Sequence, residues 1–418
     1  MANDDVEVAV IGGGAAGLAA ARRLHDAGVR CLIVEARPRL GGRAFTVSDP
    51  SGFPIDLGCG WLHSAERNPW SDIAKAQGRV IDKTPPPWER PLLTHGFPAA
   101  EQRDYLKASR AFYRRLDEAE QQPDRPASTL LEPGSRWNNL IVTVNTFVSG
   151  TELADVSAHD LARYEDDGVN WRVTEGFGTL VSSSAMDVPA MLGCPVDRID
   201  RSGRRLRIET ATGAINADQA IVAVPTPALA NEHFFVPALP AKVEAALALP
   251  LGLDDKLFMS LEHAEEFEKE SRLFGRTDRV GTGAYHFRPF GRPQIEAYFG
   301  GTLARELEAN GDAAFFDFAS GELTALLGGD FARRIRPIRV HRWGADRFAR
   351  GSYSYARPGK ADQRAVLAAP VDDRLFFAGE ACSRNDYSTA HGAWLTGVAA
   401  AGQVLDARQK SRAEAGDR

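Results

Sequence analysis

Three glycines near the start of the chain have the spacing of a phosphate-binding turn. Gly12, Gly14 and Gly17 follow an apolar run and open a segment of helical periodicity that includes Ala16. Glycines at these places allow a tight turn, close approach of the backbone to a pyrophosphate, and close packing of helix on strand. The helix N-terminus offers free N–H groups to phosphate oxygens. Because Glu35, after a second apolar run, can accept hydrogen bonds from both ribose hydroxyls, the pattern predicts a dinucleotide site without a 2′-phosphate.

A second glycine-rich segment lies directly after this acid. Arg37 and Arg43 flank the pair Gly41 and Gly42, and arginine presents a fork of donors that matches phosphate oxygens. Such a loop can hold a pyrophosphate from its other side. A nicotinamide dehydrogenase does not need this second loop, so the two segments together favour FAD. The alternative is a strand–helix joint that binds no ligand, since glycine turns serve many such joints.

Lys256 is the most diagnostic single residue of the remaining chain. It shares a face with Phe258 in a segment that is apolar on both faces if it forms a strand. Burying an ammonium group without a partner costs free energy or lowers its pKa, so such a lysine points to a reactive site. The alternative is a lysine paired with Asp254 or Asp255 at an exposed sheet edge.

The glycine turn requires a strand–helix–strand unit to position it. Apolar runs at residues 6–11 and 29–34 flank a helical segment at 18–27, and residues 375–378 form another apolar strand that Gly379 and Glu380 end. A final alanine-rich helix is expected over residues 392–405. We therefore expect an α/β protein whose Rossmann-type FAD-binding domain is assembled from discontinuous segments.

A second domain with a mixed sheet flanked by helices is expected to bind the substrate. Strands are predicted at residues 254–261, 284–287 and 294–299, and helices at 71–76, 101–120, 304–307 and 315–327. We assign residues 1–80, 175–230 and 340–410 to the FAD-binding domain, 81–174 and 231–339 to the substrate-binding domain, and 411–418 to a polar tail.

Four further motifs resemble those of the flavin-containing amine oxidases, the superfamily of monoamine oxidases, polyamine oxidases and lysine-specific histone demethylases. Residues 35–43 resemble the motif E-A-x-x-R-x-G-G-R, and residues 56–63 resemble D-x-G-x-x-W-I-H of polyamine oxidases. Residues 377–380 and 389–397 resemble the C-terminal F-A-G-E and T-V-H-G-A-x-L-S-G. The resemblance spans nearly the whole chain in the right order.

This resemblance assigns roles to individual residues. It implies catalytic roles for Lys256, Tyr353, Thr389, Trp343 and His63. Cofactor binding is expected at Gly12, Gly14, Ala16, Gly17, Glu35, Ala36, Arg37, Gly42, Arg43, Gly60, Trp61, Val196, Trp343, Gly379, Glu380, Thr389 and Ala390. In the family, the lysine holds a water near flavin N5, the tryptophan packs at the edge of the flavin ring, and the tyrosine forms one wall of the substrate cage. His63 is either a residue of the substrate entrance or a structural histidine.

Two positions depart from the monoamine oxidases. Thr389 stands where these enzymes have a second tyrosine, as in the demethylase branch, and Ser352 stands where they carry a cysteine linked to the flavin. The resemblance therefore implies non-covalent FAD and a substrate other than a simple monoamine.

The expected reaction is oxidation of a small-molecule amine by hydride transfer from its α carbon to flavin N5. The resulting imine would hydrolyse to an aldehyde or ketone, with O2 or another acceptor reoxidising the flavin and O2 giving H2O2. The alternatives are an FAD-dependent desaturase or protoporphyrinogen-type oxidase, and a flavin-bound interaction module that performs no turnover.

Composition narrows these classes further. The 418 residues are 44% hydrophobic and 25% charged with a net charge of −6, which argues against disorder and against a nucleic-acid partner. The four cysteines form no C-x-x-C pair, so no metal site is expected. With no apolar run of membrane-spanning length and no leader in the first residues, we expect a cytoplasmic protein that does not bind membranes. The oligomeric state stays open, with a homodimer as one alternative.

Overall fold

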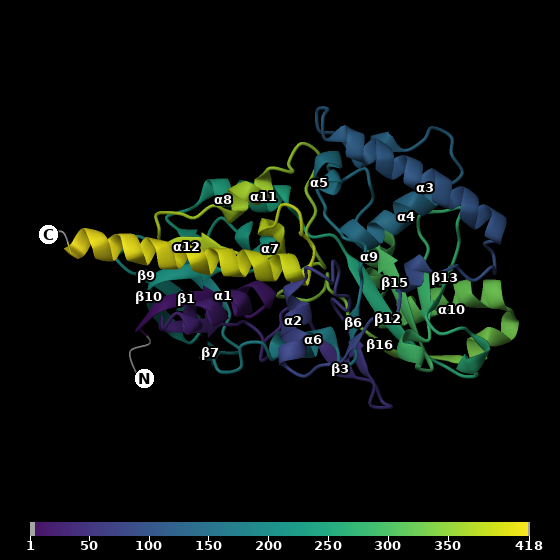
Figure 1. The fold of residues 1–418 in the computed structure, drawn as a ribbon, viewed down its shortest axis with the longest axis horizontal. Helices are drawn as coiled ribbons and strands as arrows, with labels where there is room; N and C mark the ends of the chain where they lie inside the picture. Colours follow the sequence, from purple (N-terminus) through teal and green to yellow (C-terminus); the bar gives the residue numbers. More distant parts are fainter. Residues whose placement is uncertain (1–4, 417–418) are drawn as a thin grey trace.

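The computed structural model describes residues 5–416 of the chain. Two β-sheets lie toward opposite ends of its long axis, and each sheet is covered by helices (Figure 1). The expectation of a leader-free start rests partly on residues 1–4, which lie outside the described residues. The mixed α/β class expected from the sequence is confirmed.

The first sheet has eight strands with a parallel centre. It runs in the order β11-β8-β9-β10-β1-β2-β7, and β17 pairs with β10. The strands are β1 (Asp5–Ile11), β2 (Cys31–Val34), β7 (Ala190–Met191), β8 (Val196–Asp200), β9 (Leu206–Thr210), β10 (Gly213–Val222), β11 (Phe235–Val236) and β17 (Leu375–Phe377). Because β1 pairs in parallel with both β10 and β2, segments far apart in sequence meet at the carboxyl end of β1. This is the edge at which open α/β sheets bind ligands.

Two helices cover one face of this sheet and cross at a glycine. Helix α1 (Ala15–Asp26) packs against α12 (Ala390–Gly416), the long yellow helix of Figure 1. A Cβ on Gly397 would lie 2.1 Å from the carbonyl oxygen of Ala16, so the helices can approach this closely only at a glycine. Helix α12 begins earlier than expected and continues to Gly416 through the segment assigned to a polar tail. Arg408 of this helix pairs with Glu7 of β1, which anchors its C-terminal half.

The second sheet is antiparallel in every pairing among the described residues. Its order is β13-β14-β15-β12-β16. The strands are β12 (Asp254–Leu261), β13 (Ser271–Phe274), β14 (Ala284–Phe287), β15 (Gln294–Gly300) and β16 (Ile335–Val340). The expectation of a mixed sheet was wrong in this detail, because β13, β14 and β15 follow one another through short connections that can join only antiparallel strands.

Helices enclose the second sheet and add a separate helical cluster. Helices α9 (Gly301–Asn310) and α10 (Asp312–Leu327) share an apolar core with the sheet. The cluster of α3 (Ala99–Ala119), α4 (Asn138–Ser149) and α5 (Ala158–Ala162) has its own core, which includes Phe112 and Leu140. Helix α4 was not predicted, because its β-branched residues have low intrinsic helix propensity and its packing against α9 and β15 overrides that preference.

Shorter elements connect these layers. They are the hairpin strands β3 (Thr46–Ser48) and β4 (Pro54–Asp56), the pair β5 (Ile81–Asp82) and β6 (Arg172–Val173), and helices α2 (Pro69–Ala76), α6 (Phe177–Ser182), α7 (Thr226–Leu229), α8 (Pro240–Ala248) and α11 (Gln363–Ala368). Strand β11 and helix α8 belong with the first sheet, since Phe235 and Ala245 lie in its apolar core. The boundary drawn at residue 231 therefore falls too early. Among the described helices, none combines the length and apolar character needed to cross a bilayer.

Candidate active site

One large cavity, of about 1100 Å³, brings the predicted residues together. It is lined by the carboxyl end of the first sheet, by β12, β14 and β15 of the second sheet, and by loops between them. Every predicted catalytic residue lines it, as does every predicted cofactor residue except Gly17. Their individual roles stay predictions.

The glycine turn after β1 depends on its lack of side chains. Gly12 adopts a φ of +102°, and a Cβ there would lie 2.5 Å from the carbonyl oxygen of Ala223. A Cβ on Gly17 would lie 1.8 Å from the carbonyl oxygen of Gly12. Gly17 therefore lets α1 pack on the turn, which explains why it does not face the cavity.

The second glycine-rich loop lies against the first. The N–H of Gly41 donates to the carbonyl of Gly13 at 2.8 Å, and a Cβ on Gly42 would lie 3.1 Å from the Cα of Gly14. The two loops form a narrow cradle of bare backbone at the start of α1. Because α1 has no side-chain cap and no acidic residue in its first turn, the positive end of the helix opens on this cradle.

Glu35 is fixed at the edge of the cradle. Its two carboxylate oxygens accept hydrogen bonds from the N–H groups of Gly13, at 2.6 Å, and Arg37, at 2.7 Å. The side chain is buried and lines the cavity. Each oxygen keeps a free lone pair, so the carboxylate can still accept hydrogen bonds from a ribose.

The two arginines of the second loop are held by acidic partners. Arg37 makes a bidentate pair with Asp346, at 2.8 and 2.7 Å. Burial alone would raise the pKa of Asp346, but hydrogen bonds from His341 and Arg37 hold it far below its ordinary value. Arg43 lies 3.1 Å from Glu380 and donates to a backbone carbonyl at 2.7 Å. Both arginines line the cavity, and contact of either with a phosphate remains a prediction.

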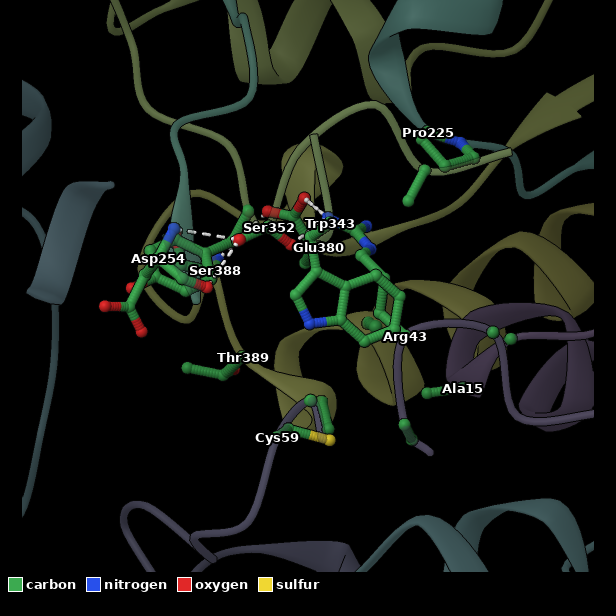
Figure 2. A pocket seen from close by; sticks show the side chains of 18 of the residues that line it. Ala15, Arg43, Cys59, Pro225, Asp254, Trp343, Ser352, Glu380, Ser388 and Thr389 are labelled. Atoms are coloured by element: carbon green, nitrogen blue, oxygen red, sulfur yellow. Dashed lines mark hydrogen bonds and ion pairs between the residues drawn. The ribbon is translucent and has the colours of Figure 1, made fainter. Parts of the chain in front are cut away.

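Glu380 accepts hydrogen bonds from several donors. It lies 3.1 Å from Arg43 (Figure 2). It also accepts hydrogen bonds from the hydroxyl of Ser354, at 2.6 Å, and from the N–H of Ser388, at 3.0 Å. Burial alone would raise the pKa of Glu380, but the positive charges of Arg43 and Arg364 and the hydrogen bonds lower it. The carboxylate is therefore charged and fixed.

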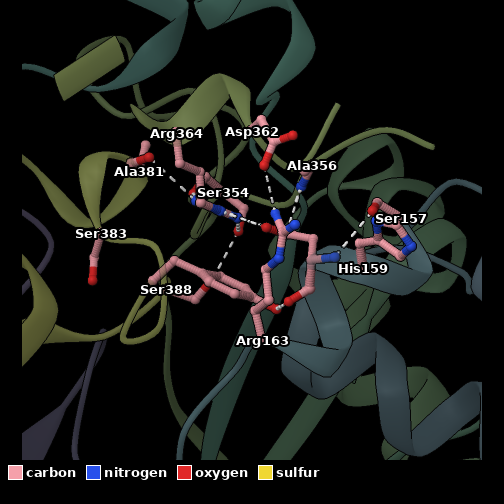
Figure 3. Close-up of polar contacts among 12 residues, drawn as sticks. Ser157, His159, Arg163, Ser354, Ala356, Asp362, Arg364, Ala381, Ser383 and Ser388 are labelled. Atoms are coloured by element: carbon pink, nitrogen blue, oxygen red, sulfur yellow. Dashed lines mark hydrogen bonds and ion pairs between the residues drawn. The ribbon is translucent and has the colours of Figure 1, made fainter. Parts of the chain in front are cut away.

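Behind Glu380 lies a buried ion pair that the sequence did not indicate (Figure 3). Arg364 makes a bidentate pair with Asp160, at 2.6 and 2.8 Å, and donates to the hydroxyl of Ser354 at 2.9 Å. The hydroxyl of Ser388 donates to the carbonyl of Ser354 at 2.7 Å. This network links α5, α11 and the segment before α12, and it holds the donors of Glu380 in place.

Trp343 forms part of the cavity wall through two buried hydrogen bonds. Its indole N–H donates to the carbonyl of Leu57 at 3.0 Å, and its backbone N–H donates to Asp255 at 3.0 Å. The ring lies between Arg43 on one side and Asp254 on the other (Figure 2). The prediction that it packs at the edge of a ring system fits this rigid placement.

Lys256 is buried in the cavity wall with an acidic partner. Its Nζ lies 2.9 Å from a carboxylate oxygen of Glu296 and donates to the carbonyl of Asp56 at 3.2 Å. Burial alone would lower the pKa of Lys256, but the charge of Glu296 raises it above its ordinary value. The ammonium form is therefore stable, and the alternative of a lysine paired at an exposed edge is wrong.

Glu296 connects Lys256 to a chain of buried polar side chains. Its second carboxylate oxygen lies 3.8 Å from Nδ1 of His286, whose Nε2 lies 2.6 Å from Glu270. Glu270 pairs with Arg172 at 2.7 Å. All of these side chains are buried. Sequence reasoning missed them, because they lie on β6, β14, β15 and the turn before β13, which meet only in the folded chain.

Asp254 differs from the other acids of the cavity. The hydroxyl of Ser352 accepts from its N–H at 2.9 Å and donates to its carbonyl at 2.8 Å, which fixes the backbone (Figure 2). Its carboxylate Oδ1 is buried and has no hydrogen-bond partner within the described chain. Burial raises the pKa of Asp254 well above its ordinary value, against the lowering effects of Lys256 and Tyr353.

The remaining predicted side chains form walls of the cavity. Tyr353 donates its hydroxyl to the carbonyl of Phe147 at 2.5 Å. Thr389 caps α12, since its hydroxyl accepts from the N–H of Gly392 at 2.9 Å. The Nδ1 of His63 lies 2.6 Å from the side-chain oxygen of Asn170, and burial lowers the pKa of His63.

Within residues 5–416, no group of three potential ligands could hold a metal ion.

Comparison with known proteins agrees with this geometry. The sequence pattern of the family described as flavin containing amine oxidoreductase matches residues 15–77 and 103–405. The chain belongs to this family. It is thus an oxidoreductase that acts on amines, and a flavoprotein.

Curated relatives cover nearly the whole chain. Polyamine oxidase 2 of Arabidopsis thaliana and polyamine oxidase 3 of Oryza sativa subsp. japonica are each 30% identical to it, over 94% of this chain and 87% of each relative. Lysine-specific histone demethylase 1 homolog 2 of Oryza sativa is 29% identical over 96% of this chain and 57% of its own length. The resemblance found in the motifs is therefore confirmed.

Proposed function

We propose that this protein binds FAD without a covalent link and uses it to oxidise a small amine. The observation that carries the proposal is the position of Lys256, a buried ammonium group held by Glu296 in the wall of the same cavity that contains the glycine cradle. Bound FAD would supply a two-electron acceptor for a hydride from the α carbon of the amine, after which hydrolysis gives an aldehyde or ketone and O2 is reduced to H2O2.

The cradle fits a dinucleotide. A Cβ at Gly12 would collide with the carbonyl oxygen of Ala223, and one at Gly42 would crowd Gly14. The backbone itself must therefore form the binding surface. The uncapped N-terminus of α1 suits the pyrophosphate, and Glu35 suits the ribose.

A non-covalent cofactor agrees with the chemistry of the nearby side chains. Ser352 provides no thiol, and its hydroxyl is engaged with the backbone of Asp254. Cys59 lines the cavity, but burial raises the pKa of its thiol to about 12, which disfavours the nucleophilic thiolate. Acid precipitation should therefore release all of the yellow colour into solution.

The chain's own residues bind and orient the amine. The ammonium of Lys256 can hold a water by donating a hydrogen bond, while Tyr353 and Trp61 provide aromatic walls. Aromatic faces attract cationic groups and exclude water. The exposed acids Asp117 and Asp166 also line the cavity, and each of them would attract a cationic group.

Anaerobic reduction tests this proposal directly. The purified protein should absorb in the visible region, and that absorbance should bleach when a suitable amine is added without oxygen. Monoamines, polyamines and amino acids would be screened in parallel. A flavin that none of these reduces would contradict the proposal and favour the desaturase alternative or a module without turnover.

A further inference from the structure

The cavity contains a half-buried acid, Asp254, with one shielded oxygen that lacks a hydrogen-bond partner among the described residues. Oδ1 of Asp254 is shielded from solvent and accepts no hydrogen bond from any described residue. A carboxyl group in this condition costs several kcal/mol if it is charged and unpaired. Such a group does not stabilise the fold by itself, so we ask which ligand it could bind.

The position of Asp254 relative to Lys256 is set by the strand. The two residues are separated by one residue on β12, so their side chains leave the same face of the sheet about 7 Å apart along the strand. Both line the cavity. Figure 2 shows Asp254 beyond Trp343, away from Ala15 and Arg43 at the dinucleotide end. Asp254 therefore faces the part of the cavity left for substrate.

The charged groups around Asp254 leave it uncompensated. Lys256 already pairs with Glu296, so the two together add little net charge. The other acid nearby is Asp255, which accepts a hydrogen bond from a backbone N–H, and Tyr353 is the neighbouring hydroxyl group. A cation is the one kind of partner that this set of neighbours does not supply.

We propose that Asp254 receives the ammonium group of the substrate and takes one proton from it. The proposal rests on the proposed amine oxidation. One N–H bond of the ammonium breaks, an O–H bond forms on Oδ1, and the electron pair of the broken bond stays on nitrogen. The substrate becomes a neutral amine with a free lone pair, and the carboxylate becomes a carboxylic acid. The proton leaves to water after the product departs.

The local environment favours this transfer. Burial removes more solvation from an ammonium–carboxylate pair than from the corresponding neutral amine and carboxylic acid, so the proton moves toward the carboxylate. The backbone hydrogen bonds between Asp254 and Ser352 fix the acceptor in position. The amine is thereby held beside Tyr353 in the uncharged form that oxidation requires.

Binding of an inert cation tests the recognition step without turnover. The probe is tert-butylammonium, whose carbon bears no hydrogen to be removed, and tert-butanol is its neutral counterpart. Binding to the oxidised holoprotein would be followed by the change in visible flavin absorbance. The wild type should prefer the cation by about 10- to 100-fold, the range of a hydrogen bond to a charged group. Asp254→Asn should remove this preference, while Glu262→Gln, an exposed charge just after β12, should keep it.

The rate of anaerobic flavin reduction tests the proton transfer. Asp254→Asn should slow reduction by about 100-fold, the lower part of the usual range for acid–base groups, and Asp254→Glu should recover part of the rate. The wild type should lose rate as the pH falls and Asp254 becomes protonated, and Asp254→Asn should lack this dependence. The inference would be overturned by an Asp254→Asn protein that melts like the wild type, keeps the cation preference and is reduced at the wild-type rate.

If no amine reduces the wild type, the proposed function fails. The binding experiment then still decides whether Asp254 recognises a cation.

Discussion

Two carboxylates that line the same cavity, Glu380 and Asp254, have opposite environments. Glu380, at the dinucleotide end, accepts hydrogen bonds from Ser354 and Ser388 and pairs with Arg43, and its pKa is lowered. Asp254, at the substrate end, keeps a buried oxygen without a partner, and its pKa is raised. The surroundings of Glu380 keep its carboxylate charged and immobile. The surroundings of Asp254 allow its charge to change when a ligand binds.

The comparison extends to the surroundings of each acid. Glu380 is supported by a second layer, the bidentate pair of Arg364 with Asp160, so its donors cannot move away. Ser352 fixes the backbone of Asp254, whereas the carboxylate oxygen Oδ1 keeps its hydrogen-bonding capacity free. Groups that hold a permanent occupant gain from complete pairing, whereas groups that act on a transient one must keep bonding capacity free.

Removing the cation at the substrate end should have the largest effect. Lys256→Met is expected to slow anaerobic reduction by amine about 100- to 10,000-fold, because the site would lose the ammonium group proposed to hold a water. Stopped-flow absorbance measures this. Lys242→Met is the matched control, since Lys242 is also buried but donates to backbone carbonyls outside the cavity. Equal losses in both variants would assign the effect to lost folding.

Removing the negative charge of Glu380 should reduce both the stability of the protein and its retention of the cofactor. Glu380→Gln is expected to lower the free energy of unfolding by about 3 kcal/mol, because Arg43 and Arg364 lose a buried negative charge. The ratio of visible to ultraviolet absorbance should fall as well. Denaturant titration and this ratio provide the two measurements, and a variant with unchanged flavin content would contradict a role for Glu380 at the cofactor.

The helix crossing beneath the cradle provides a sharper steric test. Gly397→Ala should cost about 1–3 kcal/mol of stability, because the new methyl group would be forced against the carbonyl of Ala16. Gly402→Ala in the same helix meets nothing within 4 Å and should instead stabilise α12 slightly. Thermal melting of the two variants compares them directly. If both substitutions shifted the melting temperature in the same direction, the close contact between Gly397 and Ala16 would not limit stability.

The pH dependence of stability should separate the two acids. Since the folded pKa of Asp254 lies above its unfolded value, the native state holds the extra proton, and the unfolding free energy falls as pH rises between the two values. Glu380 acts in the opposite direction, because its lowered pKa adds stability that is lost as pH falls. Above about pH 4, the unfolding free energy of Asp254→Asn should therefore fall less with rising pH than that of the wild type. The difference should be about 1.4 kcal/mol for each unit by which the folded and unfolded pKa values of Asp254 differ. Urea titrations across pH measure this slope, and an unchanged slope would contradict the raised pKa.

The dinucleotide end was more predictable than the substrate end for a physical reason. Glycines such as Gly12 and Gly42 specify backbone geometry locally, so their spacing alone indicates the cradle. The partner of Lys256 depends on strand register, because Glu296 faces Phe258 on β12 and reaches Lys256 only diagonally. No local pattern encodes that register.

The sequence places Asp254 only in the alternative in which Asp254 or Asp255 pairs with Lys256 at an exposed edge. In the fold, Lys256 pairs with Glu296, and Oδ1 of Asp254 has no hydrogen-bond partner among the described residues. Helix α4 was missed because tertiary packing decides its conformation. Local signals therefore predicted the glycine-rich cradle and the longer strands β1, β12 and β15. Contacts between distant strands determine the ion pairs around Lys256.

The contact of Gly397 with Ala16 has a consequence for biosynthesis. The ribosome makes the glycine turn first, but the helix that covers α1 emerges only after more than nine-tenths of the described chain has been translated. During elongation the apolar face of α1 stays uncovered and the riboflavin-derived group has no complete pocket to enter. The cavity is therefore completed only by the last helix, because Ala390 and Ala393 of α12 line it.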